Sequence, residues 1–96
     1  MPAVVWTPSA TADLQRHYDF LEPLDTKAAA RAIQKIVQAG ESLEQFPQRG
    51  AIVDEAAGLR KLIVRFGKAG FVLHYVVLDS EVLILRVYHN RENRPV

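Results

Sequence analysis

Residues 70–88, GFVLHYVVLDSEVLILRVY, decide how this chain folds. The run 71–78 is apolar except for His74, which is typical of a central strand. An Asp-Ser-Glu connection follows, and then a second apolar run, 82–88, which is interrupted by Arg86. A short polar connection between two such runs predicts an antiparallel hairpin near the end of the chain.

Successive side chains of a strand point to opposite faces of its sheet, so each run divides into two sets. One set of the second run is wholly apolar, and we expect it to meet helices; it consists of Leu83, Leu85 and Val87. The other set would lie on the opposite face; it consists of Val82, Ile84, Arg86 and Tyr88. The first run would add to that opposite face a set with one polar member; it consists of Val72, His74 and Val76.

The segment before this hairpin has the period of a third strand. In residues 59–66, apolar positions alternate with Lys61 and Arg65, which predicts a half-buried strand. The glycine-containing segment 67–70 predicts the turn that leads from this strand into the hairpin.

The first half of the chain has the period of helices. Val4–Trp6 is a short β-type run, and Thr7-Pro8 supplies the residue types of a helix N-cap and first helical position. Apolar residues at spacings of four and three continue until Pro23 ends this helix. Asp25 is suited to cap a second helix, whose apolar stripe runs to Leu43.

Together these elements predict an α+β fold in the order β-α-α-β-β-β. An N-terminal helix hairpin would pack on one face of a small, mainly antiparallel sheet, because this arrangement buries both apolar surfaces. A chain of 96 residues has the size of one domain, so residues 1–96 are expected to form a single unit. The polar tail from about residue 90 is expected to be loose.

The composition is that of an ordinary globular protein, with 49% hydrophobic and 24% charged residues. The absence of cysteine excludes a disulfide framework and thiolate metal sites. The histidines lack metal-ligand spacing and the sequence has no phosphate-binding glycine loop, so we expect neither a metal nor a cofactor. Without a signal-peptide pattern or an apolar run that could span a bilayer, a cytoplasmic protein with no membrane contact is expected.

The second half of the chain has a basic excess, with eight Lys and Arg against five Asp and Glu in residues 49–96. If the strand registers align, His74 would share the open sheet face with three basic residues: Lys61, Arg65 and Arg86. His89 and Arg91 would lie at its rim. Such a cluster can bind phosphate, and with Tyr88 it can cleave RNA by acid–base chemistry. Two structural interpretations stay open: the charges prevent edge aggregation, or Arg86 pairs with an acidic residue of a partner.

The open face is also expected to be apolar. If nothing covered it, the face would expose a set that a monomer rarely leaves bare: Val72, Val76, Leu78, Val82 and Ile84. We therefore expect a cover, which could be a partner segment, a dimer mate or the C-terminal tail.

Five strings, in this order along residues 4–92, resemble the RelE/ParE superfamily of bacterial toxins. They are VWTPSATADL (5–14), LEQFPQRG (43–50), GLRKL (58–62), GFVLHY (70–75) and VLILRVYHNRE (82–92). They resemble, respectively, the first strand and helix start, the end of the second helix, and the three following strands of that superfamily.

The resemblance implies the toxin of a type II toxin–antitoxin pair, a class associated with growth arrest and plasmid stabilisation. A cognate antitoxin would silence it by wrapping its C-terminal segment around the toxin in a hetero-oligomer, and only the antitoxin would contact operator DNA. ParE-like members poison DNA gyrase, whereas RelE-like members cut mRNA on the ribosome. This chain departs from the RNase pattern at Val72, where such toxins carry Arg, and its tail after Arg91 has no Tyr.

These departures favour a ParE-like gyrase inhibitor that is not an enzyme. The alternative is a ribosome-dependent mRNA endoribonuclease, in which Tyr88 or His89 would act as acid or base while basic residues hold the phosphate: Lys61, Arg65 and Arg86. A second alternative is a non-toxic, antitoxin-binding corepressor. In either toxin the residues expected to bind the antitoxin or target are Val72, His74, Val76, Ile84, Arg86, Tyr88 and Arg91.

Overall fold

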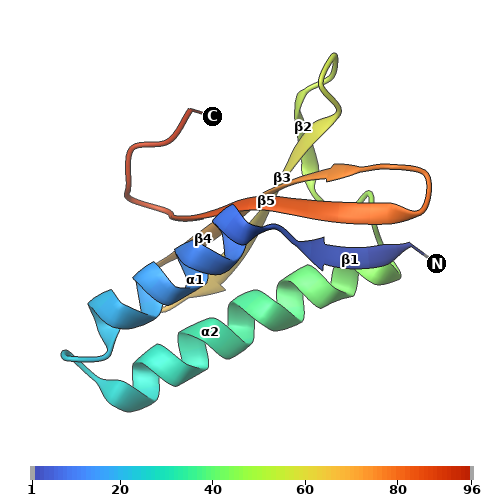
Figure 1. Ribbon diagram of the computed structural model, residues 1–96. Helices are drawn as coiled ribbons and strands as arrows, with labels where there is room; N and C mark the ends of the chain where they lie inside the picture. The colour runs from blue at the N-terminus through green and yellow to red at the C-terminus, as the bar shows by residue number, and fades with distance from the viewer. Residues whose placement is uncertain (1, 96) are drawn as a thin grey trace.

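The computed structural model describes residues 2–95 and has helices on one side of a five-stranded sheet (Figure 1). The elements are β1 (Ala3–Trp6), α1 (Pro8–Leu21), α2 (Thr26–Glu41), a 3-10 turn (Ser42–Glu44), β2 (Ala51–Asp54), β3 (Leu59–Phe66), β4 (Ala69–Val77) and β5 (Glu81–His89). The predicted α+β class, with a helix hairpin on one face of a mainly antiparallel sheet, is confirmed. No helix among the described residues is long and apolar enough to cross a membrane.

Strand β2 is the element that the sequence did not predict. It has four residues, and only Ile52 and Val53 are large and apolar, which is too short a run to establish an alternation. The strand pairs antiparallel with β3 through Ala51 opposite Lys61 and Ile52 opposite Arg60. The sheet therefore gains a short edge strand, which projects with the β2–β3 hairpin away from the helices (Figure 1).

The strand order in the sheet is β1-β5-β4-β3-β2. Strand β1 runs parallel to β5, and the other neighbours are antiparallel. The two flanking strands are shorter than their neighbours: β1 pairs with residues 81–84 of β5, and β2 with residues 59–61 of β3. Strand β5 therefore continues beyond the end of β1, and β3 continues beyond the end of β2.

Both helices begin at the residues that the sequence indicated. The Thr7 side chain accepts a hydrogen bond from the Ala10 N–H at 3.2 Å, and Asp25 accepts one from Ala28 at 3.0 Å. These bonds satisfy donors that have no partner within the first turn of a helix. The caps fix where each helix starts relative to the sheet.

The core lies between the helices and one face of the sheet, with Ile36 of α2, Leu43 of the 3-10 turn and Leu73 of β4 fully buried. Helix α2 lies so close to the first strand that a Cβ on Gly40 would come within 2.4 Å of the Trp6 ring. Glycine at this position is therefore required by packing rather than by its backbone angles.

Fully buried Tyr75 ties the connection after the helices to the middle of the sheet. Its hydroxyl donates to the Pro47 carbonyl at 2.9 Å and accepts the Gly50 N–H at 2.8 Å. Burial raises the pKa of Tyr75, so the hydroxyl stays protonated and keeps both bonds.

A register shift in β5 corrects one prediction about its faces. Tyr75 lies opposite Ile84, but the preceding His74 lies opposite Arg86, so Leu85 has no counterpart in β4. One extra residue inverts the alternation of a strand. Ile84 and Val82 therefore belong to the core on the helix side, and the expectation that Leu83 and Leu85 meet the helices is wrong. Val87, beyond the shift, faces the helices as predicted.

Candidate functional site

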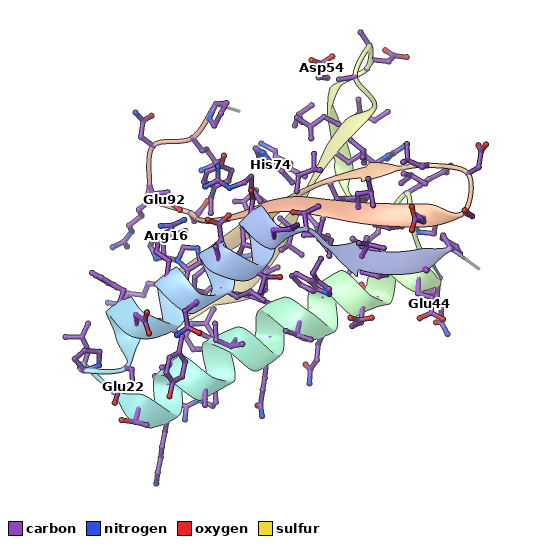
Figure 2. All side chains as sticks on the ribbon, viewed as in Figure 1. Arg16, Glu22, Glu44, Asp54, His74 and Glu92 are labelled. Carbon is purple, nitrogen blue, oxygen red and sulfur yellow. The ribbon has the colours of Figure 1, made fainter. Side chains whose placement is uncertain are left out.

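The sheet face turned away from the helices, called the open face below, carries the predicted basic residues. The registers align Lys61 of β3, His74 of β4 and Arg86 of β5 in one row across three strands. Figure 2 shows His74 on the side of the sheet opposite the helices. Arg65 shares this face but lies two rows away, opposite Gly70.

The middle of the open face is closely packed. The His74 and Tyr88 rings meet edge to face with centroids 5.0 Å apart, and the Arg86 guanidinium carbon lies 5.0 Å from the Tyr88 centroid. His74 is only 4% exposed, Tyr88 9%, and Val72 is fully buried. Three of the predicted binding residues are therefore largely covered by their own neighbours, and Ile84 lies on the other face of the sheet.

The apolar part of the open face differs from the predicted set. Leu59, Val76, Leu83 and Val5 align in one row across four strands, and each is half-buried. The predicted apolar patch included Val82 and Ile84. On the open face their place is taken by the row of Leu59, Val76, Leu83 and Val5. Leu78, in the β4–β5 connection, is half exposed. An apolar row beside a basic row is a surface suited to a protein segment.

Arg86 is bound within its own chain. Its Nε donates to Asp13 Oδ2 at 2.7 Å and its Nη2 donates to Oδ1 at 3.1 Å, which is a bidentate pair. Burial alone would raise the pKa of Asp13, but the hydrogen bonds from Arg86, the Val87 N–H and Arg16 outweigh it, and the pKa is lowered. The bond to Asp13 raises the pKa of Arg86. The acidic residue was expected to come from a partner protein, whereas the structure places it on α1 of the same chain.

Helix α1 also completes the edge of β5 where β1 has ended. The Val87 N–H donates to Asp13 Oδ2 at 2.8 Å, and His17 Nε2 donates to the Val87 carbonyl at 2.8 Å. Burial lowers the pKa of His17, which favours the neutral ring that donates through Nε2. Two side chains of a helix therefore bind the backbone groups that a further strand would have bound.

Asp13 and His17 were not recognised as structural residues from the sequence. Both are buried on the face of α1 that also holds Ala10. The spacing 10, 13, 17 is that of one helical face, so the signal was available. Polar residues on such a face are more commonly exposed, and only a backbone edge that needs hydrogen bonds explains these two.

A cavity of about 350 Å³ lies at the far end of α1. Its lining residues are Arg16, His17, Phe20, Leu21, Phe71, His89, Arg91 and Glu92. The His89 ring contacts Phe71 edge to face at 5.5 Å, and Phe71 belongs to the core. His89 therefore lies on the helix side of the sheet. The predicted grouping of His89 with Arg86 and Tyr88 is wrong, because successive residues of β5 point to opposite faces.

The polar tail is anchored at Glu92. Its carboxylate accepts a hydrogen bond from Arg16 at 3.0 Å and another from the His89 N–H at 2.8 Å. Figure 2 shows Arg16 and Glu92 pointing toward one another between α1 and the tail. Burial would raise the pKa of Glu92, but these hydrogen bonds lower it overall. The tail was expected to be loose, and at this position it is held.

The residues that were predicted to act together in RNA cleavage thus lie on opposite sides of the sheet. Arg86 and Tyr88 lie on the open face, where the arginine is engaged by Asp13 and the tyrosine is covered. His89 lies in the cavity on the opposite side. Acid–base cleavage requires a proton donor or acceptor within reach of the phosphate-binding groups, and this arrangement does not place His89 there.

The fold of this chain is shared with solved structures of two toxin–antitoxin systems. A solved structure described as a chromosomal ParDE toxin–antitoxin system from P. aeruginosa superposes with a TM-score of 0.77 at 32% identity, covering 93% of this chain and 96% of that one. The toxin–antitoxin complex RelBE2 of Mycobacterium tuberculosis superposes with a TM-score of 0.63 at 28% identity, covering 93% and 99%.

The family model described as the ParE toxin of the type II toxin–antitoxin system parDE matches residues 4–94. Toxin RelE2 of Caulobacter vibrioides is 36% identical over 89 residues, 93% of this chain and 96% of its own length. Toxin RelE3 of the same organism is 35% identical over 94 residues, 98% and 100%. The chain therefore belongs to the ParE toxin family within the RelE/ParE superfamily, as the sequence motifs indicated.

Proposed function

We propose that this toxin acts by binding and inhibiting DNA gyrase, without catalysis of its own. The observation that carries this proposal is the bidentate bond between Arg86 and Asp13. A guanidinium that holds a buried carboxylate of its own chain has fewer donors for a phosphate. The strand residue best suited to bind RNA therefore has a structural role.

Two further features support a binding protein over a nuclease. Val72, where RNase members carry an arginine, is fully buried beneath the open face. Tyr88 is packed between the His74 ring and Arg86. A buried tyrosine has little access to a substrate backbone, so neither position presents the groups that RNA cleavage needs.

The proposal includes a cognate antitoxin that neutralises the toxin by covering its surface. The P. aeruginosa and M. tuberculosis neighbours are described as toxin–antitoxin systems or complexes. The half-buried apolar row of Leu59, Val76, Leu83 and Val5 supplies a surface that the antitoxin's C-terminal segment would cover. Operator DNA would be contacted only through the antitoxin in the resulting hetero-oligomer.

A supercoiling assay tests the gyrase proposal. Purified toxin added to gyrase and relaxed plasmid should reduce supercoiling, and a DNA-damage reporter should rise when the toxin is expressed without antitoxin. Heat-unfolded toxin is the control for nonspecific inhibition. Normal supercoiling at high toxin excess, together with growth arrest and a flat reporter, would reject gyrase as the target.

The row of Lys61, His74 and Arg86 favours a second candidate, the ribosome-dependent mRNA endoribonuclease. In that function Lys61 and Arg65 would bind the phosphate, and they can be replaced without disturbing the Asp13 pair. Expression of the double variant Lys61→Ala, Arg65→Ala should then abolish mRNA cleavage while the protein stays folded. Unchanged mRNA patterns on expression of the wild-type chain would exclude this function. Harmless overexpression without an antitoxin would instead support the non-toxic corepressor.

A further inference from the structure

The second half of β3 presents backbone donors that no described strand covers. Strand β2 pairs with residues 59–61 of β3, which continues beyond this pairing. The Lys61 carbonyl points toward β2, because a Cβ on Gly50 would lie 2.6 Å from it. Backbone groups alternate in direction along a strand, so the N–H groups of Ile63 and Arg65 point outward as well.

A groove of about 410 Å³ runs between this edge and helix α2, and its charged residues are all basic. They are Lys35 of α2, Arg49 of the connection after the helices and Arg65 of β3. None of the ion pairs within residues 2–95 involves any of the three. A hydrogen bond from Arg49 Nη1 to Ser42 Oγ at 2.6 Å fixes the position of this guanidinium. Cations beside backbone N–H donors are the groups that bind phosphate.

Helix α2 continues the positive charge beyond the groove. Its exposed face carries Lys27, Arg31 and Lys35 at a spacing of four residues, and no ion pair of the described residues neutralises them. The rise from Lys27 to Lys35 is about 12 Å. One strand of duplex DNA passes a phosphate about every 3.4 Å along the axis, so roughly three or four phosphates span this row. A row of this length fits an extended polyanion better than a single phosphate ion.

We propose that the basic groove and the row on α2 form a binding site for the phosphate backbone of duplex DNA. Lys35, Arg49 and the outward N–H groups of β3 would bind one part of a strand. Arg31 and Lys27 would contact the phosphates that follow on it. Such contacts carry no sequence information, so this site would not read an operator. The inference rests on the proposed function only in taking this DNA to be the duplex on which gyrase works.

The residues of the groove favour duplex DNA over two other polyanions. Single-stranded RNA and DNA are bound largely by stacking of their bases on aromatic side chains, and none of the described residues that line the groove is aromatic. An acidic protein segment needs apolar side chains to bury, and the groove offers it little beyond Ile63, because Val64 belongs to the core. Contact with the backbone of a double strand requires neither feature.

The probe is a fluorescein-labelled duplex of about 20 base pairs and mixed sequence, titrated with the full-length toxin and followed by anisotropy. With about four or five phosphate contacts, the logarithm of the association constant should fall against the logarithm of the salt concentration with a slope of about −4. One strand of the duplex alone should bind at least about tenfold more weakly. The amide signals of Ile63 and Arg65 in 15N-labelled toxin should shift as the duplex is added, which locates binding at this edge.

Two double variants with the same change of net charge test the site. Lys35→Gln with Arg65→Gln removes two cations from the groove, so the affinity should fall about tenfold or more and the slope should become shallower by about 2. Ser80→Asp with Asn93→Asp lowers the net charge equally at exposed positions of the β4–β5 connection and the tail. This control should weaken binding less than about threefold and leave the slope unchanged. Circular dichroism of both proteins checks that they remain folded.

Several results would overturn the inference. They are equal affinity for the duplex and its single strand, no binding of the duplex at low salt and high toxin concentration, and shifts that spare Ile63 and Arg65. Equal binding of poly-glutamate with the same number of charges would assign the groove to an acidic protein instead. The supercoiling assay is independent of this probe. Gyrase inhibition without DNA binding by the toxin would therefore reject this inference alone, and DNA binding without gyrase inhibition would reject the proposed function alone.

Discussion

The sheet has two short flanking strands, β1 and β2. The backbone exposed beyond the end of β1 has partners within the chain, whereas the backbone exposed beyond the end of β2 does not pair with a described strand. Beyond β1, two side chains of helix α1 bind the backbone of Val87 in β5: Asp13 accepts its N–H, and His17 donates to its C=O. Beyond β2, the backbone of β3 at Ile63 and Arg65 meets a basic groove and no described strand. Side chains of a helix thus substitute for a strand at one edge, whereas the other edge remains available.

Burial accounts for this difference. Helix α1 packs across the end of β5, and Asp13, His17 and Val87 are all buried there. An unpaired backbone group costs about 1–3 kcal/mol when water cannot reach it, so this edge needs its own partners. At the β3 edge the neighbouring Ile63 and Arg65 side chains are exposed, and water can satisfy the backbone. The need for hydrogen bonds, rather than sheet topology, decides which edge is closed.

Hydrogen exchange should show the largest contrast between the edges. The Val87 amide is held by a buried carboxylate, so it should exchange only when the domain opens, roughly a thousandfold or more slowly than an uncovered edge amide. The Ile63 and Arg65 amides should exchange rapidly in the free protein. Native-state exchange measured by NMR checks this. Similar exchange rates at the three amides would contradict the proposed difference between the two edges.

Replacing Asp13 should be the most damaging change at the closed edge. Asp13→Ala removes the acceptor of the Val87 N–H and the partner of Arg86, and should lower the free energy of unfolding by about 2–4 kcal/mol. The lower part of this range is expected, because the Arg86 side chain is 43% exposed and water screens its charge. Urea denaturation measures the loss.

The matched control is Asp19→Ala on the same helix. Asp19 is exposed and accepts one hydrogen bond, from Gln15 at 2.8 Å, so its loss should change stability by less than about 0.5 kcal/mol. Arg86→Ala should fall between the two, because Asp13 keeps its bonds to the Val87 N–H and Arg16. Equal effects of the Asp13 and Asp19 variants would show that the carboxylate does not replace a strand.

Acidification should weaken the closed edge in two stages. His17 has a lowered pKa in the folded protein, so the unfolded chain binds a proton first, from about pH 6.5 downward. Stability should therefore be constant above that pH and fall as the pH drops below it. Asp13 and Glu92 also have lowered pKa values, so their contribution is present above about pH 4 and lost on further acidification.

The variant His17→Gln separates these stages. A glutamine can still donate to the Val87 carbonyl but does not titrate, so the first decrease in stability should be reduced while the second remains. Free energies of unfolding measured between pH 3 and 8 for both proteins provide the test. If the wild-type and variant profiles are parallel near pH 6, the histidine does not govern this stage.

The anchor of the tail should have the smallest effect. Glu92 is partly exposed, so Glu92→Gln should cost only about 0.5–1 kcal/mol, and less at high salt. The His89 amide, whose acceptor is the Glu92 carboxylate, should exchange faster in this variant. Glu22→Gln is the matched exposed control. A loss as large as that of Asp13→Ala would mean that the tail, rather than α1, holds this end of β5.

The elements that could be predicted from the sequence are those specified by local chemistry. Thr7 and Asp25 cap helices because their side chains bind donors three residues away, and this needs no knowledge of the rest of the fold. The apolar runs that became β4 and β5 were recognisable for the same reason. The order of these elements and the family motifs then determined the fold class.

The wrong predictions concern features of the structure that are determined by residues distant in the sequence. The extra residue Leu85 inverts the faces of β5 because β4 and α1 fix the register on either side, and nothing local to residues 82–88 marks it. Asp13 resembles a surface residue until the bare edge of β5 is placed beside it. The candidate site was predicted only in part for this reason: Lys61, His74 and Arg86 align as expected, whereas Ile84 and His89 lie on the other face.

Of the strands described, β5 is made after all the others, yet it lies inside the sheet and joins β1 to β4. While residues 81–89 are still within the ribosome, β1 has no strand to pair with and α1 has no edge to bind. Contacts between segments that are far apart in the sequence form late, because they require closure of a long loop. A product interrupted before residue 81 should therefore lack the strand that pairs with β1 and the backbone groups that Asp13 and His17 bind.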